Sequence, residues 1–216
     1  MIDVPNGSIK TMRRMGIDPR IVDICLLTHY HGDHCFDVGY LLWEQGLICK
    51  RESPLIIVGP KGLEETVKGI FYQAALSFEF WNQIVANTML KFIEIDGPSG
   101  EVNLDGNISV RYIKVIHGEW DAYGFLLDKG EKVLGYGGDC ILCDGIHKII
   151  QESDTAVVDM AAIKPFPIHM GIEDIKELVR LYGESHKLIA THMDDEVRNN
   201  PPEGIMIPKD GEVITI

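Results

Sequence analysis

The chain has 216 residues, of which 45% are hydrophobic, and its formal net charge is −13 because 33 acidic residues outnumber 20 basic ones. This length suits one large α/β domain or two small ones and allows a packed core. The hydrophobic content excludes an intrinsically disordered chain. The acidic balance argues against a surface that binds a large polyanion, since phosphates attract basic side chains. The sequence contains no internal repeat, low-complexity tract or long linker, so the simplest expectation is a single domain over residues 1–216.

The cysteines and the apolar runs bear on where the protein works. The cysteines are scattered and odd in number, which does not favour a disulfide framework. Cys140 and Cys143 form a lone C-x-x-C, with no second pair to complete a four-ligand zinc site. No apolar run reaches about 18 residues, and the start of the chain lacks the basic and apolar stretches of a signal peptide. We expect reduced thiols, no membrane association and a cytoplasmic location.

Short β-branched runs bounded by turn residues predict the strands. In chain order these lie at 21–27, 55–58, 92–95, 108–115, 123–127, 132–136, 156–159 and 188–190. Helices are expected over 36–44, over a long amphipathic stretch at 63–85, and over 172–182, where apolar residues recur every three or four positions. Strands mixed with helices that cover them predict a layered α/β fold.

The most informative segment is His29-Tyr30-His31-Gly32-Asp33-His34, where the first expected strand gives way to a polar loop. In an extended backbone, residues two apart point the same way, so His29 and His31 can hold one metal ion together. Gly32 permits a tight turn, after which Asp33 and His34 face a second position. Imidazole and carboxylate suit zinc, manganese or iron. The sequence therefore predicts a metal site at the end of this strand.

The pattern H-x-H-x-D-H at a strand end resembles the signature of the metallo-β-lactamase superfamily, and residues 29–34 match every defined position. The rest of the chain is most similar to the ribonuclease Z and small-phosphodiesterase branch. The similar segments, in order, are 54–60 with Gly62 and Leu63, 115–117, 136–140 and 190–192. The resemblance implies a four-layer αββα sandwich of mixed sheets with outer helices. Because the chain starts almost at the turn that Ile2-Asp3-Val4 resembles, we expect it to lack the first N-terminal strand or strands.

The resemblance also implies two divalent metal ions, with zinc expected and manganese or iron as alternatives. Its ligands are His29, His31 and His117 for one ion, Asp33, His34 and His192 for the other, and Asp139 as the bridge between them. Each ion would then keep a position for water, as catalytic sites require. A shared carboxylate would offset the repulsion between the two ions.

The function that follows is a hydrolase that uses a hydroxide activated by the dinuclear metal site, with a phosphodiester as the favoured substrate. Asp33 would orient the water and accept its proton. His169, just before the helix expected at 172–182, resembles the histidine that is proposed to protonate the leaving group in the ribonuclease Z branch. An imidazole suits this step near neutral pH. Asp159 ends the preceding strand and would orient His169.

Other functions stay open. A carbonyl-ester or lactone hydrolase would use the same ligands, and a di-iron oxidoreductase would need a flavin domain or partner. A metal-binding, redox-responsive protein without strong hydrolytic activity would use Cys35 and Cys140, which adjoin His34 and Asp139.

Members of the branch that process tRNA carry a glycine-rich basic arm, and we find none here. We therefore expect a small-molecule or short phosphodiester substrate rather than a tRNA. A homodimer would cover an open sheet edge.

Overall fold

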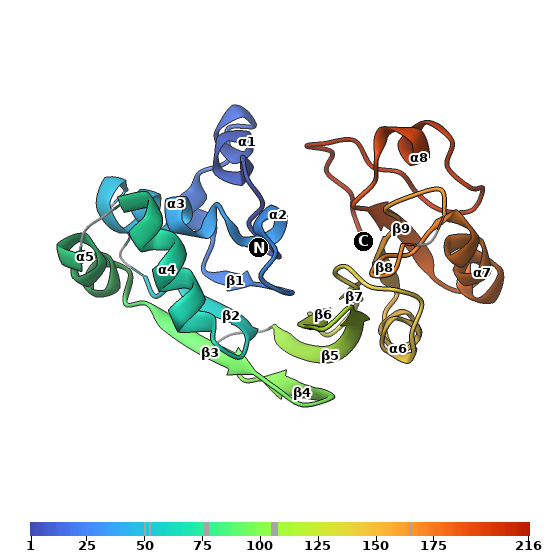
Figure 1. Cartoon of the computed structure of the whole chain (residues 1–216), viewed down its shortest axis with the longest axis horizontal. Helices are drawn as coiled ribbons and strands as arrows, with labels where there is room; N and C mark the ends of the chain where they lie inside the picture. Colours follow the sequence, from blue (N-terminus) through green and yellow to red (C-terminus); the bar gives the residue numbers. More distant parts are fainter. Residues whose placement is uncertain (50, 52, 76–77, 105–107, 165) are drawn as a thin grey trace. The chain divides into compact units, whose positions relative to one another are not determined.

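The computed structural model describes residues 1–49, 51, 53–75, 78–104, 108–164 and 166–216 (Figure 1). These residues form two compact units, Met1–Ile95 and Asp96–Ile216. Each unit combines a β-sheet with helices, so the predicted α/β class is confirmed. The single domain over residues 1–216 stays a prediction. Among the described residues, no helix combines the length and the hydropathy that crossing a membrane requires.

The first unit contains a three-stranded parallel sheet. Its strands are, in order across the sheet, β1 (Ile24–Leu26), β2 (Ile56–Pro60) and β3 (Lys91–Ile95). Apolar residues run almost without interruption through β1 and β2, which is typical of parallel strands that other elements cover. Ile2 forms a single parallel bridge with Leu26 next to β1. The loop that follows β1 therefore begins at a buried strand end.

Helices connect the strands of the first unit. They are α1 (Ser8–Arg14), the 3-10 helix η1 (Pro19–Ile21), α2 (Gly32–Cys35), α3 (Val38–Trp43), the π-helix η2 (Glu44–Ile48), α4 (Leu63–Ala75) and α5 (Phe78–Thr88). Leu41 of α3 and Leu63 and Phe71 of α4 are fully buried in one cluster with Ile57 of β2. Burial of each such side chain contributes roughly 1.5–3 kcal/mol. This cluster fixes the sheet from which the loop at residues 29–34 departs.

The long helix predicted over 63–85 is wrong, because α4 and α5 are separate helices that pack on each other. The ring centroids of Phe71 and Trp81 lie 5.6 Å apart. Ten residues along one straight helix would instead span about 15 Å. The apolar spacing continues from one helix to the next and so gives no sign of the break. Residues 76 and 77, within the predicted helix, lie outside the described residues, as do the side chains of residues 74, 75 and 78.

The second unit contains a six-stranded mixed sheet. Its strands are, in order across the sheet, β4 (Ser99–Val102), β5 (Ser109–His117), β6 (Trp120–Asp128), β7 (Val133–Tyr136), β8 (Thr155–Asp159) and β9 (Lys187–Thr191). Neighbours from β4 to β7 are antiparallel, and β7, β8 and β9 are parallel. The sequence predicted every strand of this sheet except β4, a four-residue strand with a single β-branched residue.

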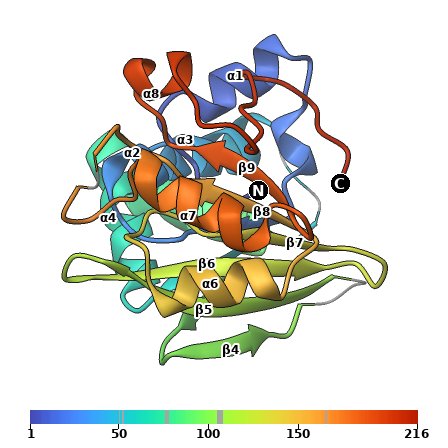
Figure 2. The ribbon, with the colours of Figure 1, turned by 90° about the vertical axis from the view of Figure 1, so that its right-hand side faces the viewer.

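Helices α6 (Asp144–Gln151) and α7 (Ile172–Tyr182) lie across one face of this sheet (Figure 2). Ile146 and Ile149 of α6 and Ile175 and Leu178 of α7 are fully buried in one cluster with β-strand residues such as Val158. The bounds of α7 agree with the predicted 172–182, whereas α6 and the short α8 (Asp195–Asn199) were not predicted. The two larger helices therefore bury apolar side chains on this face of the sheet.

Candidate metal centre

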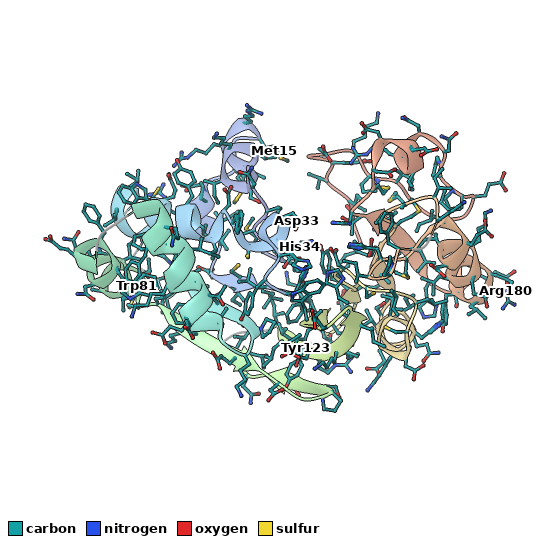
Figure 3. All side chains as sticks on the ribbon, viewed as in Figure 1. Met15, Asp33, His34, Trp81, Tyr123 and Arg180 are labelled. Atoms are coloured by element: carbon teal, nitrogen blue, oxygen red, sulfur yellow. The ribbon has the colours of Figure 1, made fainter. Side chains whose placement is uncertain are left out.

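In the first unit, three histidines converge just after β1. The ring centroid of His29 lies 4.7 Å from that of His31 and 4.2 Å from that of His34. His29 and His34 are buried, whereas Asp33 is exposed. Asp33 and His34 lie in the short helix α2, which starts at Gly32 (Figure 3). The strand end and this single helical turn therefore bring together the four residues of the first predicted cluster.

Asp3 contacts this cluster through His34. The sequence did not single it out as a site residue. Its carboxylate accepts the backbone N–H of Thr28 at 2.8 Å and the Thr28 hydroxyl at 2.9 Å. Nδ1 of His34 lies 2.8 Å from Asp3 Oδ2. Burial raises the pKa of the Asp3 carboxyl, and the hydrogen bond with His34 lowers it. The Asp3 carboxylate accepts both hydrogen bonds from Thr28. As a carboxylate it also accepts from His34, so Nδ1 of His34 carries the proton.

The backbone at Asp3 is in the left-handed region, with φ 52°. Among residues other than glycine, aspartate is one of the few that visit this region readily. The only sequence signal for Asp3 was its place in the turn Ile2-Asp3-Val4. The turn directs the Asp3 carboxylate toward Thr28 and His34, so Asp3 has a role in positioning His34.

In the second unit, the strand directions bring the remaining candidates to one edge of the sheet. Strands β5 and β7 are both antiparallel to β6, so they run in the same direction as each other and as β8 and β9. The candidates at or just after the carboxyl ends of these strands are His117, Asp139, Asp159 and His192. The carboxyl ends of parallel strands are where open α/β sheets usually place their ligands.

Four of these side chains form a compact group. Asp139, Asp159, His169 and His192 each offer a ligand atom, and these atoms all lie within 4.8 Å of one another. His192 Nε2 lies 3.3 Å from Asp139 Oδ2, and His169 Nδ1 lies 2.8 Å from Asp159 Oδ2. Burial raises the pKa of Asp159, the hydrogen bond with His169 lowers it, and the neighbouring Asp139 raises it. Two buried carboxylates at this spacing require positive charge nearby.

His117 lies beside this group, with its ring centroid 5.0 Å from that of His169. Its Nδ1 is 2.8 Å from the backbone carbonyl oxygen of Ile168. A carbonyl only accepts hydrogen bonds, so Nδ1 of His117 carries the proton and Nε2 carries the lone pair. This is the tautomer that metal-ligating histidines show when a neighbouring acceptor orients them.

His192 has an unusual backbone, with φ 56°. The left-handed conformation at the end of β9 costs free energy in a residue other than glycine. Such strain is typical of functional sites, where the surrounding structure holds the residue in place. Here it accompanies the contact between His192 and the carboxylate of Asp139.

The donors in both units fit a divalent metal ion. Imidazole nitrogens and carboxylate oxygens suit zinc, manganese and iron. His34 and His117 have Nδ1 oriented by neighbouring oxygens, which leaves Nε2 as the metal-binding nitrogen. The first unit brings together His29, His31, Asp33 and His34, and the second brings together Asp139, Asp159, His169 and His192 with His117 beside them. Their roles and the number of ions stay predictions.

The cysteine next to the first cluster behaves as a core residue. Cys35 is 1% exposed, and its Sγ donates to the carbonyl oxygen of Tyr30 at 3.4 Å. Burial raises the pKa of the Cys35 thiol to about 12. A thiol that stays protonated is a poor nucleophile and a poor metal ligand.

Residues 7–193 match the β-lactamase superfamily domain. The chain belongs to this superfamily. The predicted family is therefore confirmed on sequence, independently of the geometry of the two groups of ligands.

The sequence is also similar to curated ribonucleases Z. It is 36% identical over 70 residues to the enzyme of Alkaliphilus oremlandii, which covers 32% of this chain and 22% of that protein. It is 34% identical over 111 residues to the enzyme of Clostridium beijerinckii, which covers 51% of this chain and 34% of that protein. The matched segments thus span about a third or less of these relatives.

Solved structures confirm the predicted fold. The short form of human tRNase Z has a TM-score of 0.74 at 19% identity, covering 100% of this chain and 87% of that one. A metallo-β-lactamase fold protein from Bacillus subtilis also has a TM-score of 0.74 at 19% identity, covering 98% and 85% of the two chains. A diphosphatase of the PhnP family has a TM-score of 0.71 at 19% identity, covering 100% and 79%. At these identities the likeness concerns the fold.

Proposed function

We propose that this chain is a metal-dependent hydrolase that cleaves phosphodiesters in small molecules or short nucleotides. The observation that carries the proposal is the group of two buried carboxylates and two histidines at the carboxyl ends of β7, β8 and β9. A histidine paired with a buried carboxylate suits proton transfer, and the other carboxylate and histidine suit a metal. The similarity to ribonucleases Z in sequence favours a phosphodiester over a carbonyl substrate.

We assign the ligands by combining the two groups with the pattern of the superfamily. His29, His31 and His117 would hold one ion, Asp33, His34 and His192 would hold the other, and Asp139 would bridge them. When bound, such ions lower the pKa of a water molecule and offset the negative charge that develops on the substrate. Zinc is the expected metal, and the ligand set also accepts manganese or iron.

The remaining side chains handle protons. Asp33 is exposed, so its carboxylate can orient an incoming water molecule and accept a proton from it. The 2.8 Å contact of His169 Nδ1 with Asp159 fixes the imidazole and stabilises its charged form. The other ring nitrogen of His169 then carries the proton for the leaving oxygen. Asp159 acts through His169 and is a positioning residue.

The first test combines metal analysis with a substrate screen. We expect the chain, purified without chelator, to contain close to two equivalents of zinc or manganese and to hydrolyse bis-p-nitrophenyl phosphate. The His31→Ala variant should lose most of the metal, because one imidazole of the first cluster is gone. His147→Ala is the matched control, because His147 contacts Tyr182 on the helical face at 2.9 Å and lies in neither group of ligands.

The outcomes separate the alternatives. Turnover of a lactone with no turnover of the phosphodiester would replace our substrate class with a carbonyl one. Two bound equivalents of metal without hydrolysis of either substrate would contradict the hydrolase. Unchanged metal content in His31→Ala would contradict the ligand assignment.

A further inference from the structure

Two candidate histidines of the second unit each have an exposed aromatic residue as their partner across a tight turn. His117, at the end of β5, pairs with Trp120 at the start of β6. His169 pairs with Phe166, and their backbones exchange two hydrogen bonds, of 3.2 and 3.3 Å. Residues paired in antiparallel fashion project their side chains to the same face. Each aromatic side chain therefore lies on the same side of its turn as the histidine.

The two turns also contact each other. Nδ1 of His117 lies 2.8 Å from the carbonyl oxygen of Ile168 in the second turn. A Cβ at Gly118 would lie 2.9 Å from the ring of Trp120 and 3.0 Å from the side chain of Ile168. The ring centroids of His117 and Trp120 are 5.6 Å apart. Because Gly118 has no side chain, the Trp120 ring lies against its own turn and is held beside a candidate metal ligand.

Both aromatic side chains are open to solvent. Trp120 is 46% exposed and Phe166 is 58% exposed, whereas His117 is fully buried. Single exposed apolar side chains are ordinary on protein surfaces. Here, however, both exposed rings are the direct partners of candidate site residues. A large ring that is held in place and half open to solvent beside a metal site suits contact with a substrate.

We propose that Trp120 stacks on a nucleobase of the substrate, with Phe166 as a second aromatic contact. The inference rests on the proposed function, since it takes the substrate to be a phosphodiester, and it narrows that substrate to one with a base next to the scissile phosphate. Aromatic side chains stack on the flat faces of unpaired bases. The net charge of −13 disfavours a long polyanion, so a single base fits better than an extended strand.

Binding of a nucleoside monophosphate, which is a product of such a reaction, tests the stacking without any turnover. Calorimetry compares the affinity of the metal-loaded protein for adenosine 5′-monophosphate with its affinity for ribose 5-phosphate. The two ligands share the sugar and the phosphate and differ in the base. We expect the nucleotide to bind on the order of tenfold more tightly. NMR of the indole N–H groups gives a second readout, because a stacked base shifts the signal of Trp120.

Three variants assign the effect to one side chain. Trp120→Leu removes the ring and keeps an apolar side chain, so the affinity for the nucleotide should fall to that for ribose 5-phosphate, which should not change. Trp120→Phe should retain most of the difference, because it keeps a ring. Tyr40→Leu is the matched control, because Tyr40 is 45% exposed, lies on α3 and belongs to neither turn. It should change neither affinity.

Several outcomes would overturn the proposal. Equal affinities for the two ligands in the parent chain would do so, as would no binding of either. A preference for the nucleotide that survives Trp120→Leu would place the base elsewhere, and an equal loss for both ligands would indicate a structural role. If thermal melting shows that Trp120→Leu is unfolded, an unshifted Trp120 signal in the parent chain decides against stacking. Hydrolysis of bis-p-nitrophenyl phosphate is measured separately, so failure of the hydrolase and failure of stacking give different results.

Discussion

Replacing Asp3 with Asn tests whether the first metal cluster depends on the tautomer of His34. The substitution keeps the size of the side chain and leaves one oxygen for the backbone N–H of Thr28, which lies 2.8 Å from Asp3 Oδ1. The other oxygen becomes an NH2 group, which donates and does not accept. It then faces Nδ1 of His34 at 2.8 Å. His34 must move its proton to Nε2 to accept this bond, and Nε2 is the nitrogen that we assign to the metal.

The expected loss is in metal affinity more than in stability. Changes to residues that orient a ligating histidine typically cost 10–100-fold in affinity, about 1.4–2.7 kcal/mol. The fold should lose about 1 kcal/mol, because the hydrogen bonds to Thr28 weaken and none of the buried volume changes. The free energy of unfolding and the metal affinity should therefore respond by different amounts.

The assay is zinc competition with a chromophoric chelator, together with urea unfolding of the metal-free protein and nitrogen NMR of His34. Asp37→Asn is the matched control, because Asp37 Oδ2 accepts the backbone N–H of Gly7 at 2.9 Å and Asp37 belongs to neither group of candidate ligands. It should lower stability and leave zinc affinity unchanged. If Asp3→Asn binds zinc as tightly as the parent chain while Nδ1 of His34 has lost its proton, our account of the tautomer fails.

Three further changes test other parts of the chain. His169→Gln should lower turnover by about 10²–10⁴-fold and leave the metal content unchanged, measured by kinetics and elemental analysis. Arg51→Met should lower the free energy of unfolding by about 3–5 kcal/mol in urea, because the buried guanidinium donates to the carbonyls of Val22 and Pro54 at 2.7 and 2.8 Å and pairs with Asp23. Unchanged stability would contradict that account. Alkylation of Cys143 should rise with pH to a plateau with a midpoint at its pKa of about 6, since only the thiolate reacts. A midpoint near 9, the usual value for a cysteine, would contradict this lowered pKa.

The sequence predicted the parts of the fold and of the site that depend on local pattern. The β-branched runs located β5 to β9, and the apolar spacing located α7 at 172–182. The cluster at residues 29–34 was recognisable because ligands two apart on an extended strand end require that spacing. His117, Asp139 and His192 were placed after strands by their resemblance to the superfamily, and the structure puts each at such a strand end.

Features that depend on tertiary contacts were missed. The break between α4 and α5 leaves no mark in the apolar spacing, because both helices use the same periodicity to bury one face. The role of Asp3 requires knowing that the turn before β1 lies against residues 25 or more positions later in the chain.

The contacts that orient the histidines of the site have one property in common: each is made within a single unit. Asp3 orients His34 inside the first unit, and Ile168 and Asp159 orient His117 and His169 inside the second. These partners are held by strand pairing and core packing, which form without any metal. Each unit therefore presents its imidazoles in a defined tautomer before a metal binds. Metal binding then has less conformational freedom to remove, which favours high affinity from ligands that come from distant parts of the chain.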